Sequence, residues 1–404
     1  MTLRSPLARG SFLTTLTLPL ILVLGLAGVT ACGDDAALPD TATDTQEQDA
    51  ASTSVADVGG DDPYIWLEEV DGDRALAWVS DQNEHSLARL QSDERYESLR
   101  EEALAIYEAS DRIPYGTYFG GMVHNFWQDE DNVRGVWRRT TLDSYATDSP
   151  DWETVLDIDA LAEEEGENWV YKGRSCLPPE YAKCLVRLSR GGGDAVVTRE
   201  FDAVSKSFVE DGFFLPEAKS RVSWIDENNV FVGTDFGPGS LTSSGYPRTV
   251  RVWSRDTPLA DARQIAEADT SDVSIGGFVT WRPEGATRFV QRTPQFFKSE
   301  LFWLNDEFEP IRVPLQEDAR FSGVMGDRML VLLRSDWVVD GTTFLSGSLV
   351  SLSLPESVRT GEPSEVQLIL APTDRSAIRG VSGSREALFV SVLEEVSGSI
   401  LRLT

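Results

Sequence analysis

Histidine, cysteine and basic side chains are scarce in this sequence. Its 404 residues include two histidines and three cysteines, which are too few ligands for a structural zinc site of the usual kinds. Lysine and arginine total 36 against 67 aspartate and glutamate residues, so the net charge is −31. Nucleic acids and anionic lipid headgroups both bind clustered cations, so this balance excludes nucleic acid as a partner and argues against adsorption to a membrane surface. We expect no metal and no other cofactor.

The long apolar run of the sequence lies close to its start. Arg4 and Arg9 precede an apolar stretch at residues 12–29, and small residues follow up to Ala31. A basic start, an apolar centre and a small-residue end are typical of a secretory signal. The run is also nearly long enough to span a bilayer, so an uncleaved membrane anchor is the alternative.

The tetrapeptide Val29-Thr30-Ala31-Cys32 resembles the lipobox of bacterial lipoproteins, in which a peptidase cuts before the cysteine and that cysteine carries lipid. The resemblance favours lipid attachment at Cys32 over a plain signal peptide. It implies an exported protein, periplasmic or at the cell surface, that contacts a bacterial membrane only through the Cys32 anchor. Two or more acyl chains would hold it there stably.

An acidic segment separates this leader from the remainder. Residues 33–62 include nine acidic side chains and no lysine or arginine. Such a segment cannot bury enough apolar surface to offset the entropy of ordering, so we interpret it as a self-repelling spacer; an acidic tail that binds a partner is the alternative. The predicted domains are therefore a lipoprotein signal peptide at 1–31, an acidic disordered linker at 32–62, a helical segment at 63–111 and a strand-rich part at 112–404.

Two helices are predicted after the linker, over residues 73–90 and 93–110. The second has one apolar face at helical spacing, made of Tyr96, Leu99, Ala103, Ile106 and Tyr107. Asp93 is its expected N-cap. Such a face needs a surface to pack against.

After residue 112 the pattern changes to short strands separated by turn residues. Clear examples lie at 133–140, 184–188, 195–201, 230–233, 249–253, 288–292, 301–304, 329–333, 349–352, 366–370, 388–393 and 400–404. Nearly 300 residues of short strands are too many for one small sandwich. A β-propeller with about four strands in each blade fits their number best, and the chain would hold about five or six blades.

Several motifs resemble the prolyl oligopeptidase family. Residues 62–69, Asp-Pro-Tyr-Ile-Trp-Leu-Glu-Glu, are similar to that family's opening. The likeness continues at 77–79, 82–83, 125–129, 135–140, 166–170, 188–192, 215–224, 233–237 and 245–248. It implies a mainly β fold, in which a short α-helical segment precedes a seven-bladed-type β-propeller that admits short peptides. In the family an α/β-hydrolase domain follows, packs on the N-terminal helices and cleaves peptides after proline or related residues.

The chemistry of that family is absent from the sequence. Its serine, aspartate and histidine follow in that chain order, and the serine lies in a Gly-x-Ser-x-Gly elbow. No serine here has glycines two residues away on both sides, and both histidines precede the serine–glycine clusters at 237–245, 346–348 and 381–384. We therefore expect an incomplete propeller at 112–404, no catalytic α/β-hydrolase domain and no catalytic, cofactor-binding or metal-binding residue.

Other conspicuous side chains receive ordinary interpretations. His85 and His124 are interpreted as solvated side chains and not as general bases. The carboxylates at 163–165 are interpreted as a solvated turn and not as a cation site.

Cys176 and Cys184 flank a turn with two prolines. In an exported protein this arrangement favours a disulfide, with two buried free thiols as the alternative.

Three functions remain open. The favoured one is the N-terminal and propeller portion of a prolyl oligopeptidase-like serine peptidase, inactive alone. The second is a non-enzymatic, lipid-anchored propeller that binds peptides or a partner protein. The third is one half of an enzyme whose hydrolase domain is encoded separately. The expected partners are accordingly short peptides or such a hydrolase domain.

Overall fold

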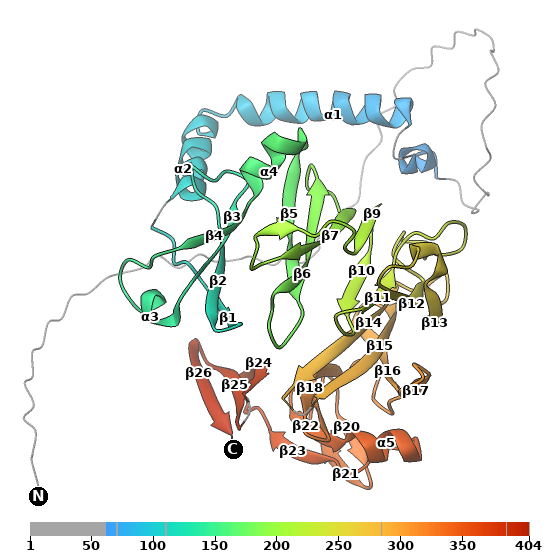
Figure 1. The fold of residues 1–404 in the computed structure, drawn as a ribbon. Coiled ribbons are helices and arrows are strands. Elements are labelled where there is room, and N and C mark those ends of the chain that lie inside the picture. Colours follow the sequence, from blue (N-terminus) through green and yellow to red (C-terminus); the bar gives the residue numbers. More distant parts are fainter. Residues whose placement is uncertain (1–61, 70–71, 110, 284, 385, 404) are drawn as a thin grey trace, which may run out of the picture. The chain divides into compact units, whose positions relative to one another are not determined.

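The computed structural model describes residues 62–403 except 70–71, 110, 284 and 385 (Figure 1). The predicted signal peptide, the lipid attachment at Cys32 and nearly all of the predicted linker lie outside the described residues. The described residues divide into two compact units, one that ends at Leu87 and one that begins at Ala88.

Helices precede the strands, as predicted. A short 3-10 helix, η1 (Ile65–Glu68), is followed by α1 (Asp73–Gln91) and α2 (Tyr96–Glu108). The predicted N-cap was wrong: Asp93 lies before α2, and its carboxylate accepts hydrogen bonds from the backbone and guanidinium of Arg95. Among the helices that the structure describes, none is long and apolar enough to cross a membrane.

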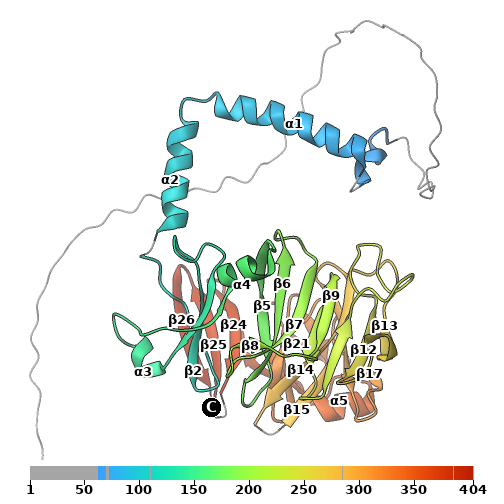
Figure 2. The ribbon, with the colours of Figure 1, turned by 45° about the horizontal axis from the view of Figure 1, so that its top comes forward.

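The described residues after α2 form six antiparallel sheets of a β-propeller, in chain order (Figures 1 and 2). The first sheet contains β1 (Thr117–Phe119), β2 (Met122–Trp127), β3 (Val136–Thr140) and β4 (Glu153–Asp157). The second contains β5 (Trp169–Cys176), β6 (Lys183–Arg190), β7 (Val196–Asp202), β8 (Ser207–Phe208) and β9 (Phe214–Ala218). The third contains β10 (Arg221–Trp224), β11 (Asn229–Gly233), β12 (Thr249–Ser254) and β13 (Arg263–Glu267).

The remaining three sheets continue the same up-and-down order. The fourth contains β14 (Ser274–Arg282), β15 (Gly285–Gln295), β16 (Lys298–Leu304) and β17 (Pro310–Arg312). The fifth contains β18 (Arg320–Met325), β19 (Arg328–Leu332), β22 (Leu349–Ser353) and β23 (Gln367–Leu370), with the hairpin β20 (Trp337–Val339) and β21 (Thr342–Phe344) inserted between β19 and β22. The sixth contains β24 (Ser376–Gly383), β25 (Leu388–Glu394) and β26 (Ser397–Leu403).

The first strands of successive sheets contact one another. β5 contacts β10, β10 contacts β14, β14 contacts β18, and β18 contacts β24. In each of these sheets the first strand is an edge strand, with the later strands following outward. These first strands therefore form the inner part of the propeller.

The hydrophobic core lies where successive sheets meet. Five clusters of buried side chains each combine residues of two neighbouring sheets. At the first junction Trp137 of β3 packs with Val186 and Leu188 of β6, and all three are fully buried. Each such side chain contributes about 1.5–3 kcal/mol when it leaves water, so the sheets hold one another in place.

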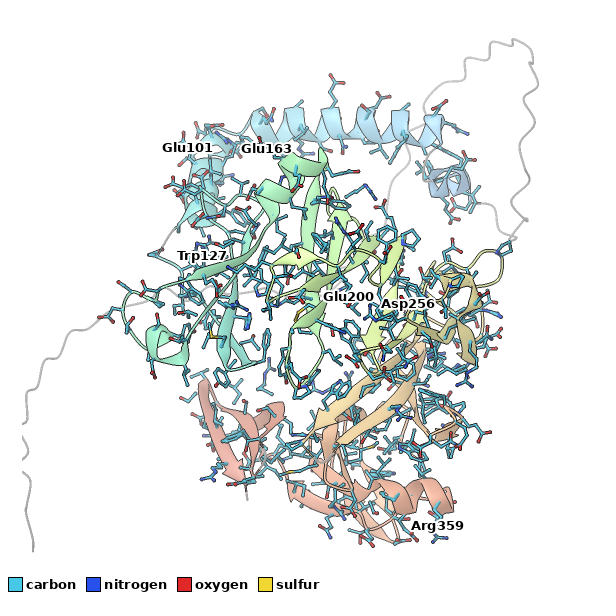
Figure 3. All side chains as sticks on the ribbon, in the orientation of Figure 1. Glu101, Trp127, Glu163, Glu200, Asp256 and Arg359 are labelled. Atoms are coloured by element: carbon cyan, nitrogen blue, oxygen red, sulfur yellow. A yellow bond between two sulfur atoms is a disulfide. The ribbon has the colours of Figure 1, made fainter. Side chains whose placement is uncertain are left out.

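Short helices fill the connections. They are α3 (Leu142–Tyr145), α4 (Ile158–Glu165), η2 (Leu259–Asp261) and α5 (Leu354–Thr360). α4 begins where the Asp157 carboxylate accepts from the Ala160 N–H, and it ends at Gly166, whose φ of 66° suits glycine. The predicted turn at 163–165 was wrong, because these glutamates form the end of α4, where Figure 3 labels Glu163.

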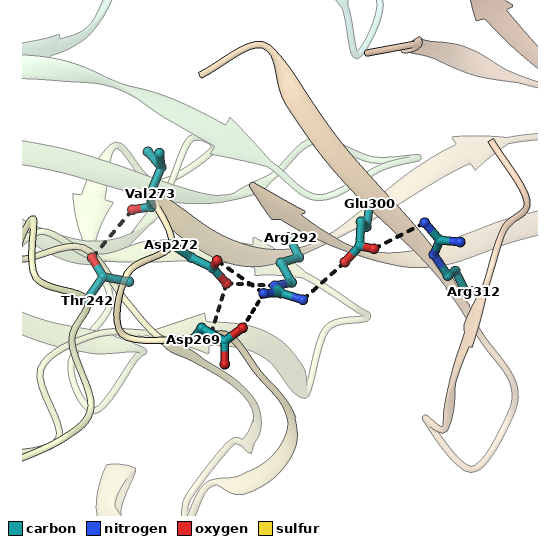
Figure 4. Close-up of polar contacts among 7 residues, drawn as sticks. All are labelled: Thr242, Asp269, Asp272, Val273, Arg292, Glu300 and Arg312. Atoms are coloured by element: carbon teal, nitrogen blue, oxygen red, sulfur yellow. Dashed lines mark hydrogen bonds and ion pairs between the residues drawn. The ribbon is translucent and has the colours of Figure 1, made fainter. Parts of the chain in front are cut away.

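A charged network fixes the connection that enters the fourth sheet (Figure 4). The Arg292 guanidinium on β15 donates to Asp272 at 2.6 Å and to Asp269 at 2.5 Å, and it also contacts Glu300 on β16 at 3.2 Å. The Asp272 side chain is only 4% exposed. The hydrogen bonds from Arg292 hold the pKa of the Asp272 carboxylate below its ordinary value, so Asp272 remains charged although it is buried.

We expect Asp272→Asn to lower the free energy of unfolding by about 2 kcal/mol, because it leaves the Arg292 charge short of its buried partner. The contribution of Asp272 to stability is present above about pH 4 and is lost as the pH falls further, because the pKa of Asp272 is lower in the folded chain than in the unfolded chain. Urea unfolding of both proteins at pH 7 measures it. Asp306→Asn is the matched control: its side chain is 97% exposed and 3.7 Å from Arg288, so we expect a change below about 0.5 kcal/mol. Equal effects of the two variants would contradict the structural role of Asp272.

Candidate functional site

The first strands carry charge of one sign. β1, β5, β10, β14, β18 and β24 contain no aspartate or glutamate. Their basic residues are Lys172, Arg174, Arg221, Arg282, Arg320 and Arg379. The chain as a whole has nearly twice as many acidic as basic residues, so the inner strands have the opposite balance.

A cavity of about 650 Å³ lies among three of these strands. Its wall includes residues of β5, β6, β10, β14 and β15 and of the loops that precede β7, β10 and β12. The charged lining residues are Arg187, Lys219, Arg221 and Asp194. A smaller cavity of about 210 Å³ shares Arg187 and Asp194 and adds Lys172.

Glycines make room for two of the arginines. A Cβ at Gly276 on β14 would lie 3.0 Å from Cδ of Arg221, and one at Gly173 on β5 would lie 3.0 Å from Nη2 of Arg187. Gly173 also has a φ of 105°, which L side chains rarely adopt. The close approach of each arginine to a neighbouring strand therefore depends on a glycine.

Neutral groups hold these cations. Arg221 donates to Ser274 Oγ at 3.1 Å, Lys172 donates to the Gly192 carbonyl at 2.7 Å, and Lys219 lies 4.7 Å from the centre of the Tyr246 ring. Within the described part of the chain, no carboxylate lies within ion-pair distance of Lys172, Arg187, Lys219 or Arg221. Burial lowers the pKa of Arg221, which an arginine tolerates while remaining charged. The cavity thus offers cationic donors that no protein carboxylate occupies.

The cavity wall offers binding groups and no evident catalytic ones. Hydroxyl groups of Ser220, Ser223, Ser274 and Thr293 accompany the cations. Among the described lining residues there is no histidine, so no serine there has an imidazole base beside it. The arrangement is suited to holding a ligand by hydrogen bonds and charge.

His124 is buried, so the expectation of a solvated side chain was wrong. It lies on β2, is 5% exposed, stacks on Phe119 with ring centres 3.9 Å apart, and accepts a hydrogen bond from Trp137 Nε1 at 3.0 Å. Burial, with smaller contributions from the charges of Arg174 and Arg139, lowers its pKa to about 4. A neutral, buried imidazole that already accepts a hydrogen bond has a structural role. His85 lies exposed on α1.

The structure joins Cys176 and Cys184 in a disulfide. Cys176 ends β5, Cys184 follows the first residue of β6, and the two residues are directly opposite in the pairing of these strands. The bond closes the loop that contains Pro178 and Pro179. It also borders a cavity of about 290 Å³ lined by Thr117, Phe119, Arg174 and Tyr181.

Comparison with known proteins gives a consistent set of relatives. Residues 39–400 match the family model described as "Prolyl oligopeptidase, N-terminal beta-propeller domain". The chain is 38% identical over 348 residues to the uncharacterized peptidase y4nA of Sinorhizobium fredii, a match that covers 84% of this chain and 48% of that protein. An uncharacterized peptidase of Rickettsia prowazekii is 25% identical over 353 residues, covering 84% of this chain and 49% of that protein.

Solved structures give the same result. A post-proline cleaving enzyme from Rickettsia typhi superposes with a TM-score of 0.77 at 26% identity, covering 84% of this chain and 51% of that one. Oligopeptidase B from Leishmania major, with a TM-score of 0.61 at 13% identity, has a similar fold. The chain spans about half the length of the curated relatives it matches.

We expect His124 to make folding pH-dependent. Its pKa is about 4 in the folded chain and ordinarily 6.5, so the unfolded chain binds more protons between these values. Stability is therefore complete above pH 6.5 and falls by up to about 3 kcal/mol as the pH approaches 4. Unfolding in urea at pH 7 and 4.5 should show a smaller loss for His124→Gln than for the wild type, and His85→Gln should behave as the wild type. An imidazole resonance of His124 that titrates near 6.5 would overturn this account.

The disulfide should resist alkylation. In a Cys32→Ser background, the oxidised chain unfolded in urea should react with no maleimide, and the reduced chain should react with two. Replacing Cys176 and Cys184 by serine should lower the free energy of unfolding by about 2–3 kcal/mol, the cost of freeing a short loop. Alkylation of both cysteines without reductant would show that they are free thiols.

Proposed function

This chain belongs to the prolyl oligopeptidase family, of which it is the N-terminal β-propeller portion, and from this we propose that it admits short peptides to a serine peptidase that cleaves after proline. We propose further that the chain is inactive alone. The observation that carries the proposal is the cavity among the first strands, which has binding groups on its wall and no nucleophile–base pair among the described lining residues.

The size and wall of the cavity support a peptide as ligand. Its volume of about 650 Å³ falls within the range of small-ligand sites. Hydroxyl groups and cations on the wall can pair with the carbonyl oxygens and carboxylates of a peptide. Phe278 and Val222 add apolar surface beside them.

The absence of the elbow motif supports inactivity of the chain alone. No Gly-x-Ser-x-Gly occurs in the 404 residues, and the buried His124 is unsuited to act as a base. The post-proline cleaving enzyme of Rickettsia typhi is matched over 51% of its length. We therefore assign the chemical step to a hydrolase domain outside this sequence, either attached to it or encoded separately.

The exposed apolar side chains of α2 are the proposed contact for that domain. Leu99, Ile106 and Tyr107 are 58%, 72% and 79% exposed. A helix that leaves its apolar face in water gains stability when a partner covers it.

We also propose export and lipid anchoring through Cys32. The lipobox-like sequence before Cys32 supports the anchor, and the acidic spacer would hold the propeller away from the membrane. A disulfide between Cys176 and Cys184 suits an oxidising compartment outside the cytoplasm.

Activity measurements test the proposal directly. The purified chain should neither cleave a proline-containing chromogenic peptide nor react with a fluorophosphonate probe, because the sequence lacks the Gly-x-Ser-x-Gly elbow that activates a serine. Mixing it with the C-terminal half of the Sinorhizobium fredii relative should give cleavage well above that of either component.

The full-length relative is the positive control for the probe. Ile106→Glu should weaken the assembly without unfolding the chain, since the side chain is exposed, whereas Arg359→Gln on α5 should leave assembly unchanged. Stoichiometric labelling of the chain alone would refute its inactivity. Peptide binding without any gain of activity would favour a non-enzymatic binding protein.

A further inference from the structure

The cavity among the first strands has a charge opposite to that of the protein. Arg187, Lys219 and Arg221 reach its wall, and Lys172 lines the smaller cavity beside it. Asp194 is the one acidic side chain among the described lining residues of either cavity. The net charge of the chain is −31, so this local excess of cations is not a consequence of composition.

Two other arginines of the propeller show the contrast, because carboxylates surround them. Arg292 contacts three of them, and Arg190 contacts both Glu167 and Glu217. The cavity arginines instead contact a serine hydroxyl and glycine positions of neighbouring strands. Their charges are therefore available to a ligand, and the hydrogen bond to Ser274 places Arg221 before the ligand arrives.

The concave shape of the cavity strengthens such charges. Cations that converge on a concave surface produce a larger potential than the same cations spread over a convex one, because field lines concentrate in the cavity. The surrounding acidic surface repels anions weakly at a distance, since salt screens charges beyond roughly 10 Å. Inside the cavity the nearby cations dominate.

We infer that the cavity lined by Arg187, Lys219 and Arg221 binds carboxylate groups of peptides, so that the propeller prefers acidic peptides to basic ones. This inference rests on the proposed function, because it names the class of peptide that the propeller admits. The carboxylate belongs either to glutamate and aspartate side chains or to the C-terminus of the peptide, and both offer the same two acceptor oxygens.

Calorimetric titration of the full chain tests the inference. The probes are eight-residue peptides, acetylated and amidated, that differ only in carrying three glutamates, three glutamines or three lysines. We expect the glutamate peptide to bind about tenfold more tightly than the glutamine peptide at low salt, because each partly exposed cation–carboxylate contact contributes a factor of about two to five. The lysine peptide should bind most weakly. A glutamine peptide with a free C-terminus shows whether the terminal carboxylate is sufficient.

Variants then assign the preference to the cavity. Among the described residues the Arg187 side chain makes no hydrogen bond, so Arg187→Gln breaks none of them. It should reduce the difference between the glutamate and glutamine peptides, and Lys219→Gln should do so independently. Arg359→Gln, on α5 and outside the cavity, should leave the difference unchanged. Circular dichroism and thermal melting identify a variant that fails to fold.

The outcomes separate the inference from the proposed function. Equal affinities of the three peptides for the wild type, or a preference that survives in both Arg187→Gln and Lys219→Gln, would overturn charge selection while leaving peptide admission intact. Binding of none of the peptides would overturn both.

Discussion

Burial of the middle strands on both faces is the constraint on which the rest of the propeller depends. All five residues of β22 are buried, as are four of five in β11. In the second to fifth sheets one face packs against the sheet before and the other against the sheet after, and the five core clusters lie at the junctions of successive sheets. Close packing at such a junction tolerates little change of volume. Each sheet therefore needs its neighbours.

This arrangement frees the first strands for another role. Because the middle strands supply most of the apolar contact, the first strands can contain glycine and arginine without weakening the core. Glycine within a strand ordinarily costs stability and often marks a close approach of another group. At Gly173 and Gly276 that group is the arginine of a neighbouring strand, so the glycines position the cations of the cavity.

The same division explains which elements the sequence revealed. Every strand range expected from the sequence overlaps an observed strand, and none of them is the first strand of a sheet. The sequences of the middle strands are apolar runs. In contrast, β10 (Arg-Val-Ser-Trp) and β24, with its glycines and serines, have no regular pattern of apolar residues. The useful signal was the distribution of charge among strands, which appears only after each strand is assigned its place in a sheet.

The environment of His124 was predicted wrongly for a related reason. β2 buries three consecutive residues, 123–125, so the alternation of buried and exposed side chains fails there. α4 was missed because its eight residues make only about two helical turns, which is too short a segment to show a helical repeat of apolar residues.

The role proposed for the charged cavity concerns peptide binding and not the chemical step. In the proposed assembly the cations contact the peptide away from the reacting serine and keep that contact during the reaction, so they would stabilise the bound state and the transition state to the same extent. Such uniform binding lowers KM and leaves kcat unchanged. Under this proposal, selection by charge and hydrolysis would be separable in the assembled enzyme. Such a separation agrees with the described lining of the cavity, which has hydrogen-bond donors and no histidine beside its serines.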